Sequence, residues 1–162
     1  MSQKRQTWGL PQAGAGEAVA GSDMKYRKKF KKPIIFIQDT GTYLNELIFC
    51  AGGTKNDVIK YLKARRDVKT NTSEWIEKVK AWEMLAEKKA VTYSDDSGRA
   101  IITTRFYEDT WDYWETIMHE LHHYVRSFSQ WKLMEEEDEA LAYLQEYLFH
   151  AIRRKLQGID KI

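Results

Sequence analysis

The sequence has little of three features that mark whole classes of protein: cysteine, long apolar runs and charge of one sign. Cys50 is the one cysteine among 162 residues, which excludes an internal disulfide and is typical of a reducing compartment. No apolar run approaches the ~18 residues of a membrane-spanning helix, and residues 1–20 lack the apolar block of a secretory signal. A net charge of +2 creates no global field for nucleic acid. We therefore expect a cytoplasmic protein with no membrane partner.

The residues that are present predict one folded domain behind an N-terminal arm. With 43% apolar residues and six tryptophans, the chain can bury one core and gives no reason for two. Residues 1–24 are mostly small or polar, so we expect this arm to lack fixed structure. A basic segment follows over residues 25–32, and the folded domain is expected over residues 33–162.

The basic segment from Lys25 to Lys32 allows two interpretations. Its charge, with Tyr26 and Phe30 as stacking residues, is compatible with an anionic partner such as nucleic acid. The alternative is a solvated arm that leads into the fold. We favour this alternative, because the stretch is short and no nucleic-acid-binding module accompanies it.

Hydrophobic patterning predicts an α+β domain, with a small sheet packed against helices. The first half is expected to hold a strand over 34–37, a short helix over 42–50 stopped by Gly52 and Gly53, a helix to about residue 66 behind a capping box at 54–57, and a helix over 73–89. The second half is expected to hold a hairpin with strands at 91–94 and 99–106, a helix over 110–128 capped by Asp109 or Thr110, a link over 129–133 and a final helix over 135–156.

Residues 119–123 read His-Glu-Leu-His-His on the predicted 110–128 helix and contain the strongest functional signal. At about 100° per residue, His119 and His123 lie about 40° apart and one turn from each other. Two imidazoles so placed can hold one tetrahedral Zn²⁺, each nitrogen about 2.0–2.1 Å from the metal. Glu120 projects about 80° to one side, where a general base for the attacking water belongs. The alternative is two core histidines that happen to be four residues apart.

A second motif opens the final predicted helix, where residues 138–148 read DEALAYLQEYL. Together with residues 119–123, this pattern resembles the zincin-like metallopeptidases whose third zinc ligand is a glutamate on the following helix. It looks like the small zincin-like proteins of phages and prophages in particular. The resemblance covers about residues 91–148. It implies a zincin-like domain in which two long C-terminal helices carry the metal site, with an unusually short spacing between His123 and the glutamate.

The resemblance assigns zinc to His119, His123 and Glu139. Glu139 is the implied third ligand because it directly precedes Ala140, a small residue that lets the two helices approach. Other acids at the start of the same helix remain alternatives, since the helix dipole favours acids there in any case. These alternatives are Glu135, Glu136 and Glu137.

Other polar residues of the two helices have open roles. Tyr143 and Tyr147 follow Glu139 by one and two turns, so either hydroxyl can stabilise an oxyanion. The alternative is a pair of core aromatics with their hydroxyls satisfied at the edge. His122 is expected to pack or to support the site rather than to bind metal. His150 lies about 16 Å along the helix from Glu139 and is expected outside the site.

The expected function is zinc-dependent hydrolysis of a peptide bond in a peptide or protein substrate, with Glu120 as the general base. The resemblance places Ile101 to Phe106 near a sheet edge that pairs with extended substrate, although this strand can equally well just cover the sheet. One alternative function is a catalytically silent zincin scaffold, a phage or mobile-element factor that binds a host protein in the host cytoplasm. The other is a nucleic-acid-associated protein that works through Lys25 to Lys32.

Overall fold

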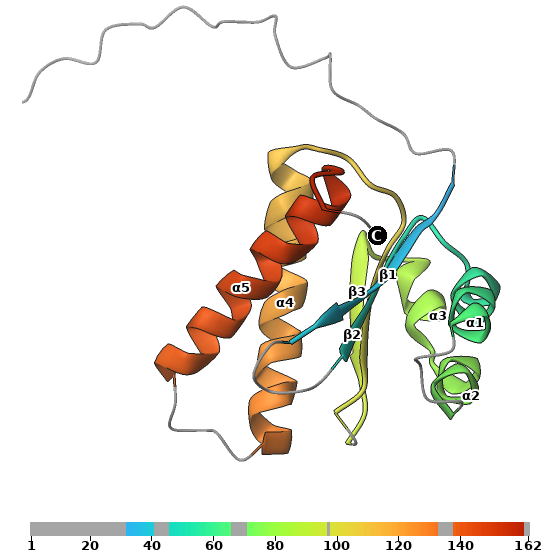
Figure 1. Cartoon of the computed structure of the whole chain (residues 1–162), viewed down its shortest axis with the longest axis horizontal. Helices are drawn as coiled ribbons and strands as arrows, with labels where there is room; N and C mark the ends of the chain where they lie inside the picture. Colours follow the sequence, from blue (N-terminus) through green and yellow to red (C-terminus); the bar gives the residue numbers. More distant parts are fainter. Residues whose placement is uncertain (1–31, 41–45, 66–70, 97, 133–137, 161–162) are drawn as a thin grey trace, which may run out of the picture.

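A four-stranded mixed sheet lies between two layers of helices (Figure 1). The fold is α+β with two long C-terminal helices, as the sequence predicts. The predictions for residues 1–24 and 25–31 fall outside the described part of the chain. The computed structural model describes residues 32–40, 46–65, 71–96, 98–132 and 138–160.

The sheet has the strand order β1-β2-β4-β3. β1 pairs antiparallel with β2, β2 pairs parallel with β4, and β4 pairs antiparallel with β3. β1 and β3 are therefore the edge strands. The predicted strand at 34–37 and the predicted hairpin are confirmed. The four strands are β1 (Ile34–Asp39), β2 (Glu46–Ala51), β3 (Ala90–Ser94) and β4 (Ala100–Thr104).

The described residues form helices on both faces of the sheet, and each face has its own core. Successive side chains of β2 point to opposite faces of the sheet, so they contribute alternately to the two cores. Leu47 and Phe49 pack with α4 and α5, whereas Ile48 and Cys50 pack with α1, α2 and α3. The helices are α1 (Lys55–Ala64), α2 (Asn71–Lys78), α3 (Ala81–Leu85), α4 (Trp111–Lys132) and α5 (Asp138–Leu156).

The expected helix over 42–50 is wrong, because residues 46–50 belong to strand β2. Every residue of β2 after Glu46 is buried, since helices cover both faces of the sheet. A strand buried on both faces is a continuous apolar run without alternation. Over so short a length, such a run cannot be told from a buried helix by periodicity.

Two helix boundaries also differ from the prediction. The expected 73–89 helix is divided into α2 and α3, because Val79 and Ala81 are both buried in one core. In a single helix these two positions would face about 200° apart. The expected link over 129–133 is wrong, since α4 continues to Lys132. Ser129 lies within this helix, and its hydroxyl donates to the Arg126 carbonyl one turn earlier at 2.8 Å.

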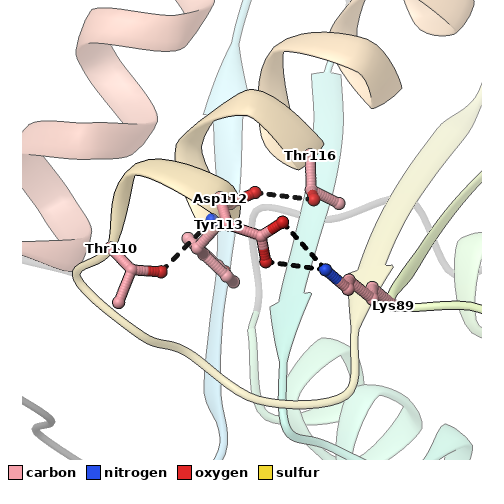
Figure 2. A network of polar contacts seen from close by, with 5 residues as sticks. All are labelled: Lys89, Thr110, Asp112, Tyr113 and Thr116. Atoms are coloured by element: carbon pink, nitrogen blue, oxygen red, sulfur yellow. Dashed lines mark hydrogen bonds and ion pairs between the residues drawn. The ribbon is translucent and has the colours of Figure 1, made fainter.

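The start of α4 is tied to the start of β3 by side-chain contacts (Figure 2). The Tyr113 N–H donates to Thr110 Oγ1 at 3.3 Å, which confirms Thr110 as a capping residue. Lys89, directly before β3, donates to the two carboxylate oxygens of Asp112 at 2.7 and 2.9 Å. Thr116 Oγ1 donates back to the Asp112 carbonyl at 2.8 Å. α4 consequently lies alongside β3, one of the two edge strands.

The other edge strand, β1, is contacted by a cation from α5. Lys155 Nζ donates to the Ile37 carbonyl at 3.2 Å and lies 4.7 Å from the centroid of the Phe36 ring. Burial lowers the pKa of this ammonium group. The long side chain of Lys155 thus covers part of the β1 edge.

Candidate metal site on α4

His119 and His123 face each other on one side of α4. Their Nε2 atoms lie 3.0 Å apart, and the two rings meet edge to face at a centroid distance of 4.6 Å. Both side chains are exposed rather than turned toward the core. Two nitrogens on one tetrahedral zinc ion lie about 3.3–3.4 Å apart, given bonds of about 2.0–2.1 Å. The pair therefore needs to open by only a few tenths of an ångström to share a metal.

Glu120 lies beside the histidine pair and is directed toward the sheet. Its side chain is buried, with 8% of its surface exposed. Thr92 Oγ1, on β3, lies 2.7 Å from Glu120 Oε2 and 2.8 Å from the Glu120 carbonyl oxygen. The second carboxylate oxygen, Oε1, makes no hydrogen bond to the described part of the chain. One oxygen of the carboxylate is thus anchored, and the other remains able to accept a proton.

A third metal ligand does not join the histidines among the described residues. No group of three His, Cys, Asp or Glu side chains is placed there to hold a metal ion. Glu139 is exposed, and its carboxylate contacts Tyr143 of the same helix, whose hydroxyl donates to Oε1 at 3.4 Å. The alternatives Glu135, Glu136 and Glu137 lie outside the described residues. The Nε2 atoms of His119 and His123 can therefore fill two of the four positions around a tetrahedral zinc ion.

The remaining polar residues of α4 and α5 lie mostly on the surface. Tyr143 and Tyr147 are 63% and 47% exposed, so the core alternative is wrong for both. His122 is exposed, with its ring centroid 6.4 Å from that of His123. His150 Nε2 lies 3.7 Å from a Glu146 carboxylate oxygen on the same helix, as an i,i+4 pair. His122 lines a groove between α4 and α5, and His150 lines a groove between β1 and α5.

The sheet edge beside this site is β3, whereas the resemblance implied residues 101–106 there, with a strand that only covers the sheet as the alternative. That prediction is wrong, because β4 pairs with β2 on one side and β3 on the other. On the β4 side, the Asp95 N–H donates to the Arg99 carbonyl, and the Arg105 N–H donates to the Lys89 carbonyl. Bonded and non-bonded pairs alternate along an antiparallel ladder. The main-chain groups of residues 90, 92 and 94 therefore face away from β4, toward an edge that no strand of the described residues covers.

Two grooves flank α5, and neither is centred on the histidine pair. One of about 480 Å³ lies between α4 and α5 and includes His122 and Arg126. The other, of about 790 Å³, lies between β1 and α5 and includes Tyr143 and Tyr147. His119, Glu120 and His123 line neither groove. Because both histidines are exposed on a helix that packs along β3, the chemistry of the pair is expected at the protein surface beside that strand.

Sequence reasoning identified Glu120 but missed its partner Thr92. Alternation along the predicted strand at 91–94 places Thr92 and Ser94 on the same face, but nothing in the sequence says which helix meets that face. The contact joins residues 28 positions apart, so only the packing of α4 on β3 reveals it.

None of the helices in the described ranges is long and apolar enough to cross a membrane. Searches of protein-family models, curated proteins and solved structures find no match to the chain, so the zincin resemblance rests on the motifs of its own sequence.

Proposed function

We propose that the chain is a zinc-dependent peptidase with its centre at His119, Glu120 and His123. The observation that carries this proposal is the approach of the two histidine Nε2 atoms to 3.0 Å, with the anchored Glu120 carboxylate beside them. Zinc bound by this pair supplies a Lewis acid that polarises a peptide carbonyl and lowers the pKa of water. The two imidazoles hold the ion, and Glu139 is the proposed third ligand.

Glu120 acts as the general base in this proposal. Its anchored oxygen, Oε2, fixes the carboxylate, and Oε1 accepts a proton from the attacking water. The same group then delivers that proton to the leaving amine. Around the helix axis, Glu120 lies about 80° from the midpoint of His119 and His123. This offset places its carboxylate next to the metal rather than on it, as a general base requires.

The open edge of β3 supports a peptide as the substrate. An extended peptide laid along this edge can bond the outward main-chain groups of Ala90, Thr92 and Ser94. Because α4 packs along β3, such a peptide would pass beside Glu120. These contacts involve only the main chain of the substrate, which all peptides share, so they indicate a peptide as the substrate class. They do not specify which side chains the substrate carries.

Two variants test the proposal against its alternatives. Glu120→Gln keeps the shape of the side chain and should keep zinc, while hydrolysis of a mixture of unstructured peptides falls by about 10²–10⁴-fold. His123→Ala should lose zinc and hydrolysis together. His150→Ala, an exposed histidine on α5, is the matched control and should retain both.

The outcomes separate the candidate functions. A silent scaffold would bind zinc without any hydrolysis by the wild-type chain, and a non-metal pair of histidines would bind no zinc at all. If the chain is a nucleic-acid-associated protein, its affinity for nucleic acid should fall steeply as the salt concentration rises. Removal of residues 1–32 should abolish that binding. Full hydrolysis by Glu120→Gln would reject the proposed role of Glu120.

A further inference from the structure

The hydroxyl of Thr92 is the side-chain donor that meets the Glu120 carboxylate. Thr92 lies on β3, on the face that α4 covers, whereas its neighbours Val91 and Tyr93 pack into the opposite core. Its Oγ1 lies 2.7 Å from Glu120 Oε2 and 2.8 Å from the Glu120 carbonyl oxygen. Within the described residues, no cation pairs with this buried carboxylate.

A single hydroxyl proton faces these two acceptor oxygens, and the carboxylate has the greater need of it. The Glu120 carbonyl lies inside α4, where it already accepts the N–H four residues along the helix. The carboxylate has no such partner, and a hydrogen bond to a charged acceptor is stronger than one to a neutral acceptor. The Thr92 proton therefore serves mainly to hold Glu120 Oε2.

We propose that Thr92 is the positioning residue of Glu120, fixing one carboxylate oxygen so that the other faces the reacting water. This inference rests on the proposed function. It adds a link between base and substrate, because the main-chain groups of Thr92 face the open edge of β3. A peptide that is hydrogen-bonded to the main chain of Thr92 is thereby positioned relative to the Glu120 carboxylate, which the hydroxyl of Thr92 holds.

The chain offers a matched pair of substitutions. Thr92→Val removes the hydroxyl and keeps the branched shape, and Thr92→Ser keeps the hydroxyl. Thr103, on the neighbouring strand β4, is fully buried, and its hydroxyl has no hydrogen-bond partner in the described structure except the weak sulfur neighbour Cys50. Thr103→Val is therefore the same chemical change at a position outside the site.

Kinetics with zinc analysis make the first test. Thr92→Val should lower kcat by about 10–100-fold, the usual effect of losing a supporting hydrogen bond, with KM and zinc content near wild type. Thr92→Ser should restore most of kcat, and Thr103→Val should match the wild-type chain. A Thr92→Val variant with kcat within twofold of wild type would overturn the inference.

A thermal double-mutant cycle tests the inference without any activity. Thr92→Val should lower Tm by on the order of 5 °C in the wild-type chain, where it leaves a buried carboxylate without its donor. The loss should be much smaller in a Glu120→Ala background, where no carboxylate remains to be held. Equal losses in both backgrounds would overturn the inference, even if the wild-type chain hydrolyses no peptide and the proposed function fails.

Discussion

His119 and His123 hold their Nε2 atoms 3.0 Å apart, one turn from each other on an exposed side of α4. Because two imidazoles placed in this way can share one zinc ion, zinc should stabilise the folded chain directly. Zinc at about 100 times its Kd should raise Tm by about 5–10 °C in a thermal melt, and a chelator should reverse the shift. The shift should be absent in His119→Ala. A zinc-induced shift that survives in this variant would place the metal elsewhere.

Glu139→Ala should weaken zinc binding if Glu139 supplies the third protein ligand. Titration with zinc should then show an affinity loss of at least about tenfold, because a lost ligand costs no less than a lost supporting contact. The same substitution at Glu135, Glu136 and Glu137 gives three matched controls in the same acidic run. A larger loss at one of these three positions would transfer the ligand role to that residue.

The stability of the chain should fall in alkaline solution because of Cys50. Burial raises the pKa of its thiol to about 11, from an ordinary value of about 8.5–9. Since the folded pKa is the higher one, the contribution of the thiol to stability is complete below the unfolded value. It is lost as pH rises from about 9 toward about 11, where the unfolded chain binds fewer protons. Denaturant unfolding at several pH values should show this decline in the wild-type chain. A Cys50→Ala variant with the same decline would assign it to other groups.

Gly53→Ala should destabilise the fold by about 1–3 kcal/mol through overpacking. A Cβ at this position would lie 2.6 Å from Cys50 Sγ and 3.1 Å from Pro33 Cβ. Part of the loss should return in a Cys50→Ala background, which removes the sulfur. Urea unfolding of the two single variants and the double variant measures this recovery, and strictly additive losses would contradict the steric explanation.

Removal of residues 1–24 should leave the thermal midpoint nearly unchanged. The prediction rests on the small and polar composition of this arm, which offers few apolar side chains for burial. A melt of the truncated chain beside the full chain provides the comparison. A large drop in Tm would show that Trp8 or Leu10 packs on the domain.

The elements that the sequence predicted well are those with local signals. The capping box at Thr54 and Asp57 is confirmed, with reciprocal hydrogen bonds of 3.2 and 2.8 Å. The apolar stripe of α4 depends on neighbours three and four residues apart, and that helix is also confirmed. The facing histidines follow from the same spacing. In each case the cause of the structure lies within one or two helical turns.

The features that the sequence missed depend on contacts between distant segments. β2 is a strand because it pairs with β1 and β4 and is covered on both faces, which no local pattern encodes. The sequence left open whether residues 101–106 form an exposed edge, because no local pattern reveals that β2 pairs in parallel with β4. The Thr92–Glu120 contact depends in turn on that strand order, since only an edge strand can meet α4 with one side still open.

The two edges of the sheet differ in their capacity for unwanted association. At β1, Lys155 donates a hydrogen bond to the Ile37 carbonyl and places a positive charge beside the strand. A charged side chain at an edge strand discourages edge-to-edge aggregation. The β3 edge has no such cation on the outward main-chain groups of its described residues. An edge strand that can pair with the proposed peptide substrate can also pair with unfolded copies of the same chain. Concentrated solutions should therefore aggregate by way of β3, and a short peptide occupying that edge should keep the protein monomeric.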